Sequence, residues 1–111
     1  MSLFRSKLAC FLALCSLAAY ATPSVDDALA RAVALRHAGH LQQAIEQLRS
    51  LAIGDDAVSV AARGELGAAL VQTRRYDEAE PLLRTAYEQS EGSARAWPAI
   101  ELGNLAASRR Q

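Results

Sequence analysis

The fold is decided by residues 63–70, which read RGELGAAL, and by residues 76–86, which read YDEAEPLLRTA. In both segments apolar residues recur at spacings of three and four, which is the pattern of one face of an α-helix. Gly64 and Gly67 each cost up to about 1 kcal/mol relative to alanine in a helix interior. A glycine kept at such a position indicates close approach of a neighbour. We therefore expect two helices that pack on each other through small residues.

The flanking sequence predicts more helices and no strands. Ser24 and Asp27 form a capping box, which opens a first helix, and Gly39 ends it in the left-handed conformation. Asp77 is the expected cap of the fourth helix. No run alternates apolar and polar residues with β-branched enrichment, so strands are not expected. The five expected helices cover residues 25–37, 41–52, 57–74, 77–89 and 96–109.

The chain also matches itself at an offset of 35 residues. The matched pairs are Val25 with Val60, Ala34 with Ala69, Leu35 with Leu70, Ala44 with Ala79, Leu48 with Leu83, and Arg49 with Arg84. A period of this size with two helices per unit indicates a helical solenoid. We expect units at about residues 25–56 and 60–91, and a partial unit at 95–111.

The third copy fits two offsets. Glu65-Leu66-Gly67 recurs as Glu101-Leu102-Gly103 at an offset of 36, whereas Arg74-Arg75 recurs as Arg109-Arg110 at 35. We prefer the first offset, because it places Leu102 rather than Glu101 in the buried position.

This pattern resembles the tetratricopeptide repeat (TPR), a helix-turn-helix unit of about 34 residues. The middle unit carries the Leu-Gly pair, the aromatic residue and the small positions at the matching spacings, and the first unit is more divergent. The resemblance implies an all-α, right-handed solenoid of helical hairpins, with two full repeats and a terminal helix. The expected packing residues are Leu35, Ala44, Leu48, Leu66, Gly67, Leu70, Tyr76, Ala79, Leu83, Ala86 and Trp97.

The resemblance further implies a concave groove that binds a segment of a partner protein. The matching positions are Asp26, Leu29, Val33, Arg36, His37, Ala61, Gly64, Ala68, Val71, Gln72 and Asn104. Some family members clamp a carboxylate there with Lys and Asn, but neither complete unit has these residues. The groove is mostly small and apolar with Arg36 as its one cation, so a hydrophobic or helical peptide is favoured over an acidic one.

Residues 1–21 predict a secretory signal peptide, and the mature domain would then cover residues 22–111. Arg5 and Lys7 precede an apolar run from Leu8, and Ala19-Tyr20-Ala21 suits a signal peptidase. That run is shorter than the roughly 20 residues of a membrane-spanning helix. We expect cleavage and a periplasmic location without a stable membrane span; retention as an anchor is the minor alternative.

Composition argues against several other functions. Cleavage would remove both cysteines, Cys10 and Cys15, and leave ten arginines against twelve acidic residues, a net charge of −2. Without a basic stripe, nucleic acid is not an expected partner. His37 and His40 are too few for a zinc site, and no serine lies in a nucleophile elbow. We therefore expect no metal, no cofactor and no enzymatic activity.

Two alternatives remain open from the sequence. The chain ends where the third unit should begin its second helix, so it is also interpreted as a truncated TPR region of a larger secreted protein whose activity lies in a C-terminal domain. The apolar side of the last helix also suggests self-association into a homo-oligomer. Trp97 is expected to pack that helix on its neighbour, with partner anchoring as the alternative.

Overall fold

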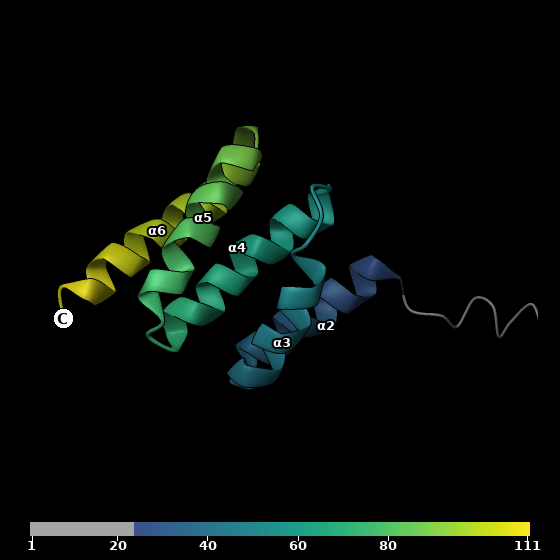
Figure 1. The fold of residues 1–111 in the computed structure, drawn as a ribbon, viewed down its shortest axis with the longest axis horizontal. Coiled ribbons are helices and arrows are strands. Elements are labelled where there is room, and N and C mark those ends of the chain that lie inside the picture. Colours follow the sequence, from purple (N-terminus) through teal and green to yellow (C-terminus); the bar gives the residue numbers. More distant parts are fainter. Residues whose placement is uncertain (1–23) are drawn as a thin grey trace, which may run out of the picture.

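The protein is all-helical over residues 24–111, the part that the computed structural model describes (Figure 1). Five α-helices and one short 3-10 helix pack together, and these residues contain no strand. Their bounds are α2 Val25–His37, α3 Leu41–Leu51, α4 Ala57–Gln72, α5 Tyr76–Gln89, η1 Gly92–Arg95 and α6 Ala96–Arg109. The predicted all-α chain with five helices is confirmed, whereas the predicted signal peptide lies outside the described residues.

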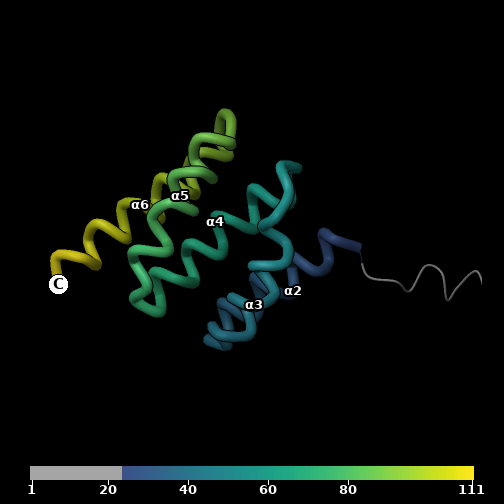
Figure 2. The backbone as a smooth tube through the Cα atoms, in the orientation of Figure 1, coloured from purple at the N-terminus to yellow at the C-terminus, as the bar shows by residue number. Residues whose placement is uncertain are grey.

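The helices form two rows (Figure 2). We call α2, α4 and α6 the inner row and α3 and α5 the outer row. Successive helices pack on each other, and so do α2 with α4 and α4 with α6. In contrast, α3 and α5 do not pack together, and an ion pair of 2.8 Å between Arg49 and Glu78 links them. Because the inner row is more closely spaced than the outer one, the array curves toward α2, α4 and α6.

The same backbone turn closes both helical hairpins, α2–α3 and α4–α5. Gly39 and Arg74 follow the helix caps and have positive φ angles of 87° and 62°. In each turn the next N–H donates to the carbonyl five residues earlier, at 2.9 Å from His40 to Leu35 and at 2.8 Å from Arg75 to Leu70. These are Schellman motifs. Gly39 and Arg74 lie 35 residues apart, so the repeat seen in the sequence is also a repeat of turn geometry.

The start of the first predicted helix agrees with the sequence. The Ser24 hydroxyl accepts from the Asp27 N–H at 3.2 Å, and Asp27 accepts from the Ser24 N–H at 3.3 Å, which confirms the capping box. Asp56 caps α4 by accepting a hydrogen bond from the Ser59 N–H. This hydrogen bond lowers the pKa of the Asp56 carboxyl group.

The prediction that Asp77 caps the fourth helix is wrong. The Schellman turn reverses the chain so tightly that α4 already ends at Gln72, and α5 begins at Tyr76. Asp77 therefore lies inside the first turn of α5, where its carboxylate is 3.0 Å from Arg109.

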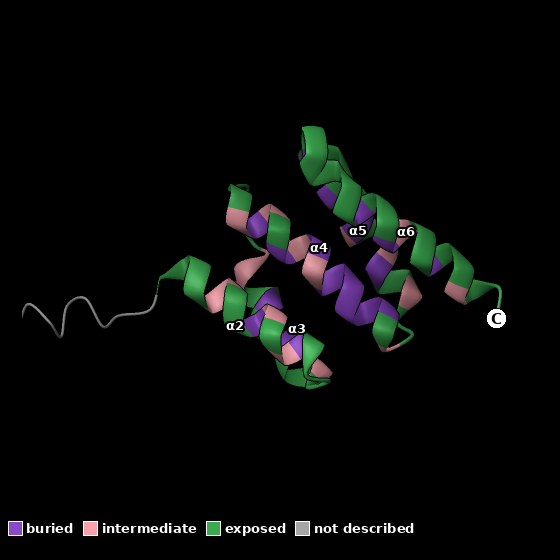
Figure 3. Ribbon diagram, turned by 180° about the vertical axis from the view of Figure 1, so that it is seen from behind, coloured by how far each residue is buried: buried purple, intermediate pink, exposed green. Residues whose placement is uncertain are grey.

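The core is centred on α4, which packs against all four other α-helices. Every residue from 66 to 71 is buried, and the corresponding part of α4 is purple in Figure 3. Seven of the predicted packing residues are at most 2% exposed, namely Ala44, Leu48, Leu66, Leu70, Ala79, Leu83 and Ala86. Gly67 is buried among them, and Leu35 and Tyr76 are partly buried against this core.

The two glycines inside α4 have different surroundings. A Cβ atom added to Gly67 would lie 2.5 Å from Cγ and Cδ2 of Leu83, closer than side-chain atoms pack. A Cβ atom added to Gly64 would lie 3.5 Å from Cδ1 of Trp97, which is an ordinary contact. Gly67 is therefore required by the crossing of α4 and α5, whereas Gly64 is not.

This difference predicts opposite effects of the same substitution. We expect Gly67→Ala to destabilise the protein by about 1–3 kcal/mol, because Leu83 is fully buried and has no room to move away. Gly64→Ala should be neutral or stabilise by up to about 1 kcal/mol through helix propensity. Urea unfolding of both variants and the wild type measures the two effects. Equal effects of the two substitutions would contradict the close crossing.

Candidate functional site

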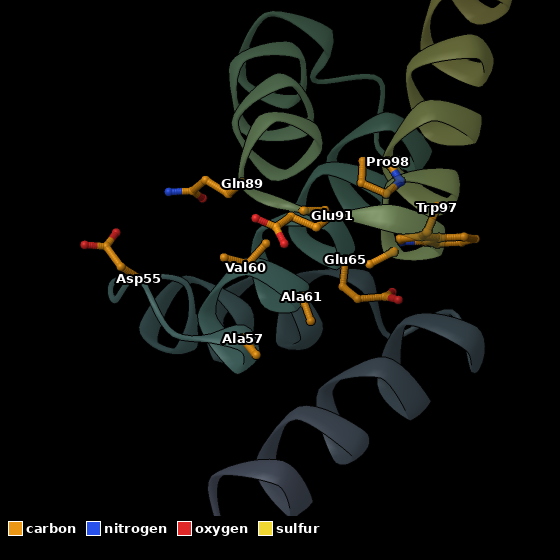
Figure 4. Close-up of a pocket in the computed structure, with 12 residues that line it drawn as sticks. Asp55, Ala57, Val60, Ala61, Glu65, Gln89, Glu91, Trp97 and Pro98 are labelled. Carbon is orange, nitrogen blue, oxygen red and sulfur yellow. The ribbon is translucent and has the colours of Figure 1, made fainter.

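A hollow of about 520 Å³ lies between α4, the end of α5 and the start of α6, and we call it the α4–α6 hollow (Figure 4). Its lining is mainly small and apolar: Ala57, Val60, Ala61, Gly64, Ala94, Trp97 and Pro98. On α4, Ala57, Ala61 and Gly64 follow one another at helical spacing and form the floor. Because their side chains are short, the space above α4 remains open.

Two arginines hold the far side of the hollow in place. Arg63 of α4 donates to the side-chain oxygen of Gln89 and to the backbone carbonyl of Gly54. Arg95 donates from Nε to the backbone carbonyl of Ser90 at 2.7 Å. These bonds fix the end of α5 and the connection into α6. Both guanidinium groups are thus engaged with oxygen atoms of the protein itself.

The charged groups that line the hollow are all acidic. They are Asp55, Glu65 and Glu91, and the lining includes no Arg, Lys or His. Glu65 is neutralised by Arg36, whose Nε lies 2.9 Å from its carboxylate. The Asp55 side chain is 95% exposed and 3.9 Å from Arg63, and Glu91 is exposed without an ion pair among residues 24–111. The unpaired charge at the mouth of the hollow is therefore the Glu91 carboxylate, and Arg63 compensates Asp55 only in part.

Beside the hollow, a polar cluster joins the three helices of the inner row. Arg36 of α2 is only 7% exposed, and besides pairing with Glu65 it donates to Gln72 of α4 at 3.0 Å. Its guanidinium carbon also lies 5.6 Å from the ring centre of Trp97 on α6. A buried cation requires such partners, and the aromatic face adds a cation–π contact. These residues, with Glu101 and Asn104, form what we call the Arg36 cluster.

Trp97 connects the cluster to the hollow. Its ring packs beside Gly64 of α4, with Arg36 over the ring, and it also lines the hollow. The side chain nevertheless stays 38% exposed. Its surface is therefore shared between helix packing and the open site. Trp97 is also the single tryptophan of the chain.

Glu101 is buried, contrary to the expectation that Leu102 would take the buried position. Glu101 is 8% exposed and accepts a hydrogen bond from Asn104 Nδ2 at 3.4 Å, while Leu102 is only partly buried. The reason is that α6 turns this residue toward the Arg36 cluster. Burial raises the pKa of the Glu101 carboxyl group, against the opposing effect of the Arg36 charge.

The remaining predicted groove residues have diverse environments. His37 lies beside Arg36, with Nε2 and Nη2 3.4 Å apart. Ala68 and Val71 are buried by neighbouring helices and offer little surface to a partner. Asp26 is exposed at the far end of α2, and Leu29 and Val33 are partly buried along that helix, away from the residues that line the hollow. Of the eleven predicted positions, Ala61 and Gly64 line the hollow.

The sequence did not predict the role of Arg36 or the presence of several other residues in the site. Arg36 is not the free cation of the groove that the sequence suggested, because Glu65 and Gln72 occupy its donors. The floor residue Ala57 could have been found from its helical spacing to Ala61. Glu91 had no comparable signal, because its place depends on how α5 connects to α6.

Within residues 24–111, no group of three or more His, Cys, Asp or Glu side chains is arranged to hold a metal ion. None of the helices described there is long and apolar enough to cross a membrane. No model of a known protein family, no curated protein and no solved structure matches the chain. Its function must therefore be argued from the hollow and the Arg36 cluster.

The buried Glu101 predicts a pH-dependent stability difference. Its raised pKa means that the stability contributed by its protonated form is present below about pH 4 and is lost as the pH rises through the folded-state pKa. The melting temperature of Glu101→Gln relative to wild type should therefore increase from about pH 4 to about pH 7. A difference that does not change with pH would contradict the burial of this carboxyl group.

Glu78 serves as the matched control. Hydrogen bonds from Arg49 and Arg75 lower its pKa, so its ionised form stabilises the fold, and that contribution is lost as the pH falls. Relative to wild type, Glu78→Gln should lose stability as the pH rises through the acidic range, the opposite sign to Glu101→Gln.

Proposed function

We propose that the protein is a non-catalytic interaction scaffold that binds a segment of a partner protein on the concave side of α2, α4 and α6. The observation that carries this proposal is the α4–α6 hollow of about 520 Å³ with its apolar floor. A volume of this size is typical of binding sites, which are mostly apolar with a few polar groups. An apolar side chain of a bound segment would bury its surface against Ala61 and Trp97.

The architecture that we propose for this scaffold is a short TPR-like solenoid with a right-handed course. Two hairpins with the same Schellman turn, 35 residues apart, support it. The curvature toward the inner row supports it as well, because solenoids bind partners on such concave surfaces. In this reading α6 is the first helix of a third, incomplete unit.

The polar groups around the hollow support binding rather than a reaction. The Ser90 hydroxyl donates to the Ala86 carbonyl at 2.6 Å, and Glu65 is paired with Arg36. Catalysis by a serine requires a neighbouring base that takes its proton, and the partner of Ser90 is a carbonyl oxygen. We accordingly assign no catalytic residue.

The location that we propose is the periplasm, reached through a cleaved signal peptide. This rests on Arg5 and Lys7 before the apolar run and on Ala19-Tyr20-Ala21. The partner would then be a protein of the cell envelope.

Site-specific cross-linking tests the binding site. A photoreactive benzoylphenylalanine replaces Ala61, which is exposed in the hollow, or in the control Glu46, which is exposed on α3. On irradiation in cells that produce the protein, we expect a partner adduct from position 61 and none from position 46. Ala61→Trp should fill part of the hollow and weaken capture of the same partner at least about tenfold in a binding assay.

Three other outcomes would contradict the assignment of the binding site to the α4–α6 hollow. Equal adducts from both positions, adducts from position 46 alone, or no adduct at either would each overturn the assignment. A measurement of helix content by circular dichroism shows whether each variant is folded.

Self-association through α6 is a second candidate, favoured by one specific contrast. Gly67 touches Leu83 of α5, but Gly103, which follows at the offset of 36, has no neighbouring atom within 4 Å of an added Cβ. Ile100 on the same helix is 56% exposed. This side of α6 is thus small, apolar and uncovered among residues 24–111.

If α6 mediates self-association, light scattering should show a dimer or larger species at concentrations of about 100 μM, and Ile100→Lys should shift it to monomer. A wild-type protein that remains monomeric at this concentration would exclude the second candidate.

A further inference from the structure

We infer that the α4–α6 hollow selects a segment that is both apolar and cationic, with an apolar side chain in the hollow and a neighbouring Lys or Arg at its mouth. This inference rests on the proposed function, since it names the kind of partner segment that the groove would bind. It differs from the expectation drawn from the sequence, in which Arg36 was the one cation of the groove and a hydrophobic or helical peptide was favoured.

The charges around the hollow favour a ligand that carries a cation. Each charged residue that lines the hollow is acidic, and Arg36 neutralises Glu65 alone. Arg63, whose side chain is mostly buried, lies 3.9 Å from Asp55 and compensates its charge in part, whereas Arg95 donates to the Ser90 carbonyl oxygen and makes no ion pair with Glu91. The exposed Glu91 carboxylate, together with the partly compensated Asp55, is therefore the charge at the mouth that a cation on the ligand would meet.

The carboxylates of Asp55 and Glu91 lie close to the apolar lining of the hollow. Asp55 follows α3, and Glu91 follows α5, so they come from different connections of the chain. In Figure 4 they lie on either side of Val60, which belongs to the apolar lining. A segment whose apolar side chain reaches this floor places its neighbouring residues close to one or both carboxylates.

The same arrangement of charged and apolar groups disfavours other ligands. An acidic peptide would bring like charges to Asp55 and Glu91, and nucleic acid or an anionic bilayer would do the same. A purely apolar peptide would fill the hollow but make no ion pair with the exposed carboxylates. A segment of another protein with alternating apolar and basic residues satisfies both parts of the site.

Trp97 provides the measurement. As the single tryptophan and a wall of the hollow, it reports occupancy through its fluorescence. The probes are three synthetic peptides of about ten residues. One has two leucines flanked by lysines, the second has glutamates in place of the lysines, and the third has alanines in place of the leucines.

We expect the lysine–leucine peptide to change the emission of Trp97 in a saturable way. The glutamate peptide and the alanine peptide should each bind at least about tenfold more weakly at low salt. The preference for lysine over glutamate should shrink in about 0.5 M sodium chloride, because exposed charges are screened.

Charge-removing variants localise the effect. Asp55→Asn combined with Glu91→Gln should reduce the preference for lysine over glutamate severalfold and leave the contribution of the leucines unchanged. Glu46→Gln combined with Glu88→Gln is the matched control, since both residues are exposed and neither lines the hollow. This control should keep the wild-type preference.

The outcomes separate the two proposals. If the lysine and glutamate peptides bind equally well, or if the control pair removes the preference, the inferred selectivity is wrong while peptide binding itself stands. If neither leucine peptide alters Trp97 emission and position 61 gives no cross-linked adduct, both the selectivity and the proposed function are wrong.

Discussion

The structure depends on the close crossing of α4 and α5 at Gly67 and Leu83. The Leu83 side chain occupies the space that any side chain at position 67 would need, so the two helices approach more closely than two ordinary faces could. Leu66 and Leu70 on α4 are buried around this crossing, as is Ala79 on α5. The other helices then pack against α4, and this makes it the centre of a small core that has no disulfide among residues 24–111.

The hollow also results from small side chains on α4. Ala57, Ala61 and Gly64 line the hollow along α4, and their small size leaves an open space instead of a filled contact. Trp97 reaches across from α6 and closes one side of it. The packing of α4 on α5 and the opening beside α6 are thus two results of one sequence pattern, small residues at helical spacing.

Local features of this chain were predictable from the sequence, and long-range ones were not. The capping box at Ser24 and the left-handed Gly39 depend on a few neighbouring residues, and both are found as expected. Arg74 adopts the same left-handed conformation as Gly39 without being a glycine, because the hairpin imposes it. The burial of Glu101 depends on three helices meeting around Arg36, and no local pattern contains that information.

Arg36 also bears on how the protein unfolds. Terminal units of a helical array generally fray before its middle, because each contacts neighbours on one side only. Here one buried guanidinium group on the first helix has partners on α4 and on the last helix. Detaching α2 would separate Arg36 from Glu65 and leave that carboxylate without its ion pair, and detaching α6 would remove the contact between Arg36 and Trp97, so either step is unfavourable. The two ends are thereby energetically coupled, and the array should open as one cooperative unit, with similar hydrogen-exchange protection in α2 and α6.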